Sequence, residues 1–427
     1  NVNFSGAGTL VSGNTISNIS TTAVSGGSIT GISFGSSNAG ATESFSSNSI
    51  TGLSAGSLGS ATGMIGGSSS VTTMTISGNI INTLSSTNST GTILGLSVTG
   101  GATVNVTGNT INTLAGSGTS TTVATGLSVT SGTAVNVSKN KIYDIAQSGA
   151  TTNAPAVNGM LFSGGTTVTA SNNLIGDLRA PAANSTDAIR GMSITSSTTL
   201  TSYNLYYNTV FINASSSSVN FGTTGLFHAA SATATTAKLD LRDNIIDNRS
   251  TPGATTGQTV VYRRSSGVAS TLANYASTSN NNDFFLGTAG ANKLIYADGT
   301  SAAATIAAYK SGVFTAGTVA PRDTASFSDP TYLSTTGSSA NFLHIDPTVA
   351  TQLESGGAPI AGITDDFDGN TRSATTPDVG ADEFTGIPLD LSPPVISYSL
   401  LGNGVVGGTR SITSVTVTDG TGVNTTA

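Results

Sequence analysis

The sequence predicts an all-β protein, a parallel β-solenoid with coils of about 30–35 residues. Two repeated phrases and one pattern predict this fold. A phrase centred on asparagine recurs along the first part of the chain, with 30 to 36 residues between successive asparagines. A second phrase, which begins with glycine, recurs with the same period. Between the phrases apolar and polar residues alternate, as they do in a strand with one buried face.

The asparagine phrase is clear at residues 106–114 and 137–145, which read VTGNTINTL and VSKNKIYDI. Its central residue suits a tight bend between strands, where asparagine tolerates left-handed backbone and bonds nearby backbone groups. In stacked coils these residues fall one above another, so we expect their amides to form a hydrogen-bonded ladder. The predicted structural ladder consists of Asn14, Asn48, Asn79, Asn109, Asn140, Asn173, Asn208 and Asn244.

The glycine phrase and its neighbours predict the strands of one coil. Residues 95–98 and 126–129 both read GLSV, in which apolar and polar residues alternate. Ile111 and Leu114 are three residues apart and bracket a further bend. Three short strands and three turns make one coil, which cannot close a core alone. Stacking at ~4.8 Å per coil buries like residues on one another.

Composition excludes several classes of function. The 427 residues include no cysteine, which excludes a disulfide scaffold, a thiolate zinc site and a cysteine nucleophile. With only two histidines, a multi-histidine metal site is not expected. A net charge of −7 with 14 Lys and Arg argues against a nucleic-acid partner. The apolar stretches are shorter than the ~20 residues of a membrane span.

The repeat resembles the right-handed parallel β-helix repeats of secreted bacterial proteins. Residues 203–213 (YNLYYNTVFIN) and 279–285 (SNNNDFF) resemble the late coils of that family, and residues 366–384 resemble its terminal signature. The pattern is frequent in large surface and secreted proteins of the Bacteroidota. The resemblance covers residues 1–385 and implies a right-handed parallel β-helix outside the cell. It says little about activity, because one fold hosts many functions.

The chain divides into four parts. Residues 1–250 are regular coils, 251–386 are irregular last coils with a cap, 387–394 form a proline-rich linker, and 395–427 begin an immunoglobulin-like β module. Residues 305–310 favour a short helix. A cap is expected because a bare last coil exposes strand edges. Two strands within 395–427 cannot form a sandwich, so either the module is cut here or the strands pair with a neighbour.

The densest charge cluster, residues 238–249, is a candidate catalytic face. Leu239 and Leu241 are expected to point inward, which leaves Lys238, Asp240 and Arg242 on one outer face. The β-helix polysaccharide lyases resemble this in placing a carboxylate and a basic group on an outer strand, since proton abstraction needs both. Alternating charges also neutralise one another on a solvated strand. We favour the ion-paired face and keep catalysis as the alternative.

Acidic residues near the end of the coils are a candidate cation site. Clustered oxygen atoms suit Ca²⁺, although their order departs from the EF-hand loop. Arg372 is also available to pair with Asp366 or Asp378. We favour a charge-paired structural cap made of Asp366, Asp368, Arg372, Asp378 and Glu383, with no resident cofactor. The alternative is Ca²⁺ bound by Asp366, Asp368 and Asn370.

Histidines and aromatic residues are expected mainly in the core. His228 occupies the inward position held by Val98 and Phe162 in earlier coils, and His344 lies in an expected closing strand. Aromatic residues concentrate after residue 200, where wider coils need bulkier side chains. The alternative is an exposed aromatic strip that stacks on sugar rings.

These features predict a non-enzymatic, secreted module: a rigid stalk or an adhesin within a large surface protein. Its expected partners are glycans or other cell-surface proteins, with neither nucleic acid nor a membrane span. One alternative is a polysaccharide-active lyase or hydrolase that uses the face of residues 238–249. The other is a fibre subunit that self-associates through residues 395–427.

Overall fold

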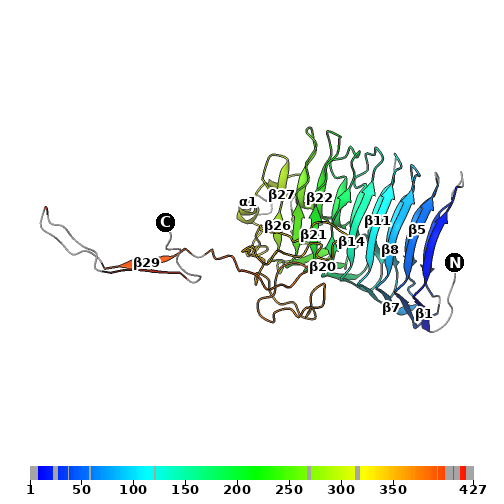
Figure 1. Ribbon diagram of the computed structural model, residues 1–427, viewed down its shortest axis with the longest axis horizontal. Coiled ribbons are helices and arrows are strands. Elements are labelled where there is room, and N and C mark those ends of the chain that lie inside the picture. The colour runs from blue at the N-terminus through cyan, green and yellow to red at the C-terminus, as the bar shows by residue number, and fades with distance from the viewer. Residues whose placement is uncertain are drawn as a thin grey trace.

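The computed structural model describes residues 8–22, 27–36, 38–56, 59–119, 122–266, 271–312, 318–391, 393–399, 407 and 414–419. Within this part of the chain the backbone winds into a parallel β-solenoid with three strands per coil, which confirms the predicted fold class. Figure 1 shows the coils stacked along the long axis of the molecule, beginning with the coil nearest the N-terminus.

The first sheet, sheet A, begins each coil and consists of eight parallel strands. The strands are β1 (Gly8–Ser12), β4 (Ala41–Ser46), β7 (Val71–Ser77), β10 (Thr103–Thr107), β13 (Ala134–Ser138), β16 (Thr167–Ser171), β20 (Ser202–Tyr206) and β23 (Lys238–Arg242).

Sheet B follows after the asparagine bend. Two of its strands, β17 and β18, are short and both pair with β14. The strands are β2 (Thr15–Ser20), β5 (Ser49–Ala55), β8 (Ile80–Ser86), β11 (Thr110–Gly116), β14 (Lys141–Gln147), β17 (Leu174–Ile175), β18 (Leu178–Arg179), β21 (Thr209–Ile212), β24 (Ile245–Asn248) and β26 (Asp283–Phe285).

Sheet C completes each coil and contains the glycine phrase. Its last strand, β28, runs antiparallel to β27 and ends the parallel stacking. The strands are β3 (Ile29–Phe34), β6 (Ala61–Gly66), β9 (Thr92–Thr99), β12 (Val123–Ser131), β15 (Val157–Phe162), β19 (Ile189–Ile194), β22 (Thr223–His228), β25 (Thr259–Arg264), β27 (Lys293–Ala297) and β28 (Ala302–Ala303).

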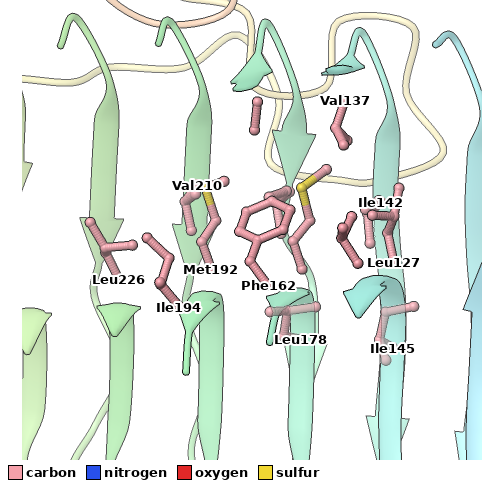
Figure 2. Close-up of a cluster of buried hydrophobic side chains, with 14 of the residues drawn as sticks. Leu127, Val137, Ile142, Ile145, Phe162, Leu178, Met192, Ile194, Val210 and Leu226 are labelled. Carbon is pink, nitrogen blue, oxygen red and sulfur yellow. The ribbon is translucent and has the colours of Figure 1, made fainter. Parts of the chain in front are cut away.

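The core consists of inward side chains stacked on the same position in the next coil. Ile111 pairs in register with Ile142, and both are fully buried. Figure 2 shows this packing, with Ile142 near Leu127 and Met192 near Phe162. The repeated glycine is required by the same packing. A Cβ on Gly126 would lie 2.6 Å from Cγ2 of Ile142 and 2.7 Å from the carbonyl oxygen of Gly159.

The last coil is covered by a short helix, α1 (Ile306–Ser311), at the place where the sequence predicts one. Thr305 caps it, because its Oγ1 accepts a hydrogen bond from the N–H of Ala308 at 3.1 Å. Tyr309 points from this helix into the core and is buried there. Its ring centroid lies 5.7 Å from that of Phe284 and 5.4 Å from that of Tyr296. The helix therefore closes the apolar end of the solenoid.

Residues 328–391, here named the lateral segment, do not cover that end. They run along the outer face of sheet B over the later coils (Figure 1). Phe342, Leu343 and Ala381 pack on outward Leu174 and Phe211. Leu353, Ile345 and Val379 pack in the same way on outward Ile245. We expected residues 366–383 to cap the last coil, and this position differs because sheet B presents apolar side chains outward there.

Beyond the lateral segment lies a two-stranded antiparallel hairpin, β29 (Val395–Tyr398) and β30 (Val415–Thr418). Every residue of both strands is exposed, and Figure 1 shows the hairpin apart from the solenoid. The two predicted strands are confirmed. The remaining positions of the expected immunoglobulin-like module, residues 400–406, 408–413 and 420–427, lie outside the described residues.

Candidate functional site

The eight predicted ladder asparagines form a single file at the corner between sheets A and B. Asn109 shows the pattern: its Nδ2 donates to Oδ1 of Asn140 at 3.0 Å and to the carbonyl of Ile76 at 2.9 Å. Its backbone N–H donates to the same Oδ1 of Asn140 at 3.1 Å. The Nδ2–Oδ1 distances are 2.8 to 3.1 Å along Asn14, Asn48, Asn79, Asn109, Asn140, Asn173, Asn208, Asn244 and Asn282.

The last asparagine of this file, Asn282, is one the repeat analysis missed. Its Nδ2 donates to Oδ1 of Asp323 at 3.0 Å, and its N–H donates to Oγ of Ser326 at 3.0 Å. The buried Asp323 also accepts from the hydroxyls of Tyr275 and Tyr309. Asn282 lies 38 residues after Asn244, close to the period, so the spacing could have identified it.

The left-handed residue at each bend precedes the asparagine instead of being the asparagine itself. Ser47, Lys139 and Asp243 have φ values of 54°, 56° and 56°. The asparagine uses its amide for the ladder, and the residue before it makes the turn. We had assigned the left-handed backbone to the asparagine, and that assignment was wrong.

The candidate catalytic face is an ion-paired strand. Lys238 is exposed at the start of β23, and Arg242 donates to Asp240 through Nε at 3.0 Å and Nη2 at 2.5 Å. Asp240 also accepts from the hydroxyls of Tyr206 at 2.9 Å and Thr278 at 3.0 Å. These four bonds occupy the acceptor positions of the carboxylate, which a general base needs free.

The charged residues after this strand do not share its face. Asp247 lies on sheet B, fully buried, and Arg249 donates to it through Nε at 2.9 Å. Burial raises the pKa of Asp247 to about 6, although the hydrogen bond from Arg249 opposes that rise. The corner between sheets A and B therefore divides residues 238–249 into two separate ion pairs.

The three residues of the Ca²⁺ alternative do not converge on one point. Asp366 accepts from the N–H groups of Gly369, Asn370 and Glu383 and from Nδ2 of Asn370, at 2.7 to 3.1 Å. Its carboxylate acceptor positions are thus used by the turn of residues 366–370 and by the backbone of Glu383. Asp368 points to His344 instead, with 2.5 Å between Oδ2 and Nε2.

Arg372 is the centre of the terminal signature and holds the lateral segment on the coils. It pairs with Glu383 at 3.1 Å, where we had offered Asp366 or Asp378 as partners. Its Nη2 donates to Oδ1 of Asn172 at 2.8 Å, and its guanidinium lies 4.1 Å from the ring centroid of Tyr207. The arrangement is structural, because every partner is a group of the fold.

Two buried carboxyl groups support the same segment. Asp243 accepts from the N–H of Ala358 at 2.9 Å, and Asp378 accepts from Ser355 and Phe384 at 2.7 Å each. Burial raises the pKa of Asp243 to about 7. Burial likewise raises the pKa of Asp378 to about 7. Both groups therefore titrate near neutral pH.

His228 is a core residue, as its inward position predicts. It is fully buried, with Nε2 2.8 Å from the carbonyl of Ala237 and Nδ1 3.3 Å from the hydroxyl of Tyr262. Burial, together with the nearby charge of Arg264, lowers the pKa of His228 to about 3. The ring is neutral and structural at physiological pH.

The aromatic residues after residue 200 lie mainly in the core. Most of these side chains are buried in the coils, and Tyr207 is covered by the lateral segment, so these described residues do not form an exposed strip of rings for sugar stacking. The fully or almost fully buried rings are Tyr203, Tyr207, Tyr262, Tyr275, Phe284 and Tyr296.

The candidate binding surface is the outer face of sheet A from β4 to β20, here named the polar face. Its outward side chains are uncharged and form hydrogen-bonded pairs between coils. Asn136 donates to Asn105 at 3.0 Å, and Asn204 donates to Thr169 at 3.3 Å. The outward positions are Thr42, Ser44, Ser46, Thr73, Thr75, Ser77, Thr103, Asn105, Thr107, Ala134, Asn136, Ser138, Thr167, Thr169, Ser171, Ser202, Asn204 and Tyr206.

An open groove borders the polar face at the corner where sheet C meets sheet A. It has a volume of about 370 Å³ and is lined by Ser, Thr and Gly residues together with Ala102. A second hollow of about 270 Å³ adjoins it and shares Ser131, Gly132 and Thr166. Gly132 has a φ of 132°, and a Cβ there would lie 2.5 Å from Cγ2 of the buried Val135, so this position in the groove wall requires glycine.

The residue before each ladder asparagine indicates which coils the lateral segment covers. The left-handed residue before each ladder asparagine is Gly or Ser in the first four coils. In the later coils it is larger, and each of these residues contacts residues 356–380. They are Lys139, Asn172, Tyr207, Asp243 and Asn281.

Among the described residues, no helix is long and apolar enough to cross a membrane. No family model, no curated protein and no solved structure matches the chain.

Proposed function

We propose that the protein is a non-enzymatic, extracellular structural and adhesive module, a rigid rod whose polar face binds hydroxyl-rich ligands such as glycans. The observation that carries this proposal is the polar face itself. Its Ser, Thr and Asn side chains repeat coil after coil, and a groove lined mainly by Ser, Thr and Gly borders them. Hydroxyl and amide groups both donate and accept, which suits the hydroxyl groups of a sugar chain.

Three further observations support the proposal. The ladder and the stacked core make the coils a continuous unit, which favours a stiff rod over a hinged one. Asp240 and Arg242 are bound to each other and to their neighbours, which does not favour the enzyme alternative. The resemblance of the repeat to Bacteroidota surface proteins favours a location outside the cell.

Glycan binding by the full chain tests the proposal, measured on a glycan array and then by calorimetry. Asn136→Arg places a bulky charge in the middle of the polar face and should abolish binding. Asn112→Arg is the matched control, because Asn112 is a partly exposed asparagine on the outer side of sheet B. Equal loss in both variants, or a chain that binds none of the glycans, would remove the adhesive part of the proposal.

A second candidate is self-association or module extension through the hairpin β29–β30. Its apolar side chains are unusually exposed: Val395 by 65%, Ile396 by 60%, Tyr398 by 59% and Val415 by 54%. An isolated two-stranded hairpin is marginal in water, so these strands favour pairing with a further strand. That strand belongs either to the immunoglobulin-like module the resemblance suggests or to a neighbouring chain.

A further inference from the structure

Three side chains from separate parts of the lateral segment meet at one point. His344, Asp368 and Asp382 each place one coordinating atom within 4.8 Å of the other two. The shortest of these contacts joins Nε2 of His344 to Oδ2 of Asp368 at 2.5 Å. The three residues are far enough apart in the chain that only the fold brings them together.

The orientation of His344 is determined by the backbone. Its Nδ1 lies 3.2 Å from the carbonyl oxygen of Phe342, and a carbonyl only accepts, so Nδ1 carries the hydrogen. In the neutral ring Nε2 then has a lone pair directed at the two carboxylates. A histidine that binds a metal is oriented in this way by a hydrogen bond from its other nitrogen.

The two carboxylates are held differently. Asp382 is 6% exposed, and its Oδ2 accepts the N–H of Ile345 at 3.1 Å, which anchors it. The side chain of Asp368 is 43% exposed, so the cluster opens to solvent on its side. Phe367 stands edge-on to His344, with ring centroids 6.4 Å apart. The cluster thus has an anchored side, an apolar wall and a route of entry.

We propose that His344, Asp368 and Asp382 bind a Zn²⁺ ion. One imidazole nitrogen and two carboxylate oxygens suit zinc, and three protein ligands leave a fourth position for water. Tetrahedral ligand atoms lie roughly 3.3 Å apart. Nε2 of His344 and Oδ2 of Asp368, now 2.5 Å apart, would therefore separate by about 1 Å, and any pair as wide as 4.8 Å would close by about 1.5 Å. Calcium prefers oxygen ligands alone, which makes this site distinct from one built on Asp366 and Asn370.

The competing arrangement is an ion pair without metal. In that case His344 is an imidazolium bound to Asp368, and Lys141 supplies a further positive charge nearby, where its Nζ donates to the carbonyl of Ser339 at 2.7 Å. The two arrangements differ in what they predict for added zinc. A bound ion cross-links residues 342–345, 366–368 and 381–382, whereas the ion pair joins only the first two.

A titration of the full chain with ZnCl₂ tests the proposal by isothermal calorimetry. One ion per chain is expected, with a rise in the thermal unfolding midpoint, and CaCl₂ should not compete. Asp368→Asn and His344→Gln should each weaken binding at least about 100-fold, because even outer-shell changes cost 10–100-fold. Asp365→Asn is the control: it removes a nearby carboxylate that pairs with Lys139 and should leave zinc affinity unchanged.

Absence of saturable zinc binding overturns the proposal, and so does binding that is equal in wild type and in both ligand variants. Asp368 is half-exposed, so its replacement should leave the fold intact, as a circular dichroism spectrum would check. The test is independent of glycan binding, since the polar face lies on sheet A and the cluster lies over sheet B.

Discussion

At the scale of single residues, the internal ladder asparagines, from Asn48 to Asn244, are hydrogen-bonded to neighbouring coils although they are buried. The amide of Asn140 donates to Asn173 and to the carbonyl of Val106, and its Oδ1 accepts two bonds from Asn109. A buried polar group left without such partners costs about 1–3 kcal/mol. Each internal asparagine therefore provides hydrogen-bond partners for polar groups of the two neighbouring coils.

Replacement of an internal asparagine should be more damaging than replacement of the first. Asn140→Leu leaves the N–H and Nδ2 of Asn109 and the carbonyl of Val106 without their partner, so we expect a loss of about 3 kcal/mol or more. Asn14→Leu is the matched control, since Asn14 is exposed and water can replace its bond. Urea unfolding midpoints measure the difference, and equal midpoints would contradict the stabilising role of the ladder.

At the scale of elements, the lateral segment shows what a sequence can and cannot predict. The strands, the bends and helix α1 can be predicted from local periodicity and capping, because each of these signals lies within a single coil. The lateral segment depends on contacts between distant residues, such as Lys139 with Asp365, which are 226 positions apart. No period relates those positions, so the acidic residues were assigned to an end cap and His344 was not connected to Asp382.

The attachment of the lateral segment should weaken as pH rises. Asp243 has a pKa near 3.9 when unfolded and about 7 when folded, so the folded chain binds the proton more tightly. Stability is therefore lost as pH rises from about 4 to about 7, by up to about 4 kcal/mol for this group. Asp378 and Asp247, whose pKa values are also raised, act in the same direction.

Asp243→Asn should remove much of this dependence. The neutral side chain can still accept from Ala358, so wild type and variant should match at pH 4 and the variant should be the more stable at pH 8. Thermal unfolding across that pH range checks the expectation. Asp346→Asn is a control, because the carboxylate of Asp346 accepts from Thr348, two residues away, and lies outside the Asp243 contacts. A variant less stable than wild type at pH 8 would contradict the sign.

At the scale of the whole molecule, the solenoid and the hairpin differ in how far their apolar side chains are buried. The solenoid is closed by α1 at one end and supports the lateral segment on one side (Figure 1), while the hairpin leaves its apolar side chains exposed. The repeat predicts the solenoid from sequence alone. The hairpin strands were also predicted, but their partner is not encoded in two short strands.

Removal of the hairpin should change association without changing the rod. If β29–β30 pairs chains together, the full chain should show concentration-dependent mass in light scattering, and a chain ending at residue 391 should remain monomeric. Electron microscopy would show filaments for the first and isolated rods roughly 40 Å long for the second, from ~4.8 Å per coil. Monomers of both lengths would favour the immunoglobulin-like module over self-assembly.

The direction of the asparagine bonds has a consequence for the length of the molecule. Every amide from Asn14 to Asn244 donates to the next asparagine toward the C-terminus, and from Asn48 onward each also accepts from the previous one. A unit that runs from one asparagine to the next is therefore interchangeable with any other in its bonding. Duplicating or deleting such a unit leaves no amide unmatched, so evolution or an engineer can adjust the reach of the rod in steps of one coil.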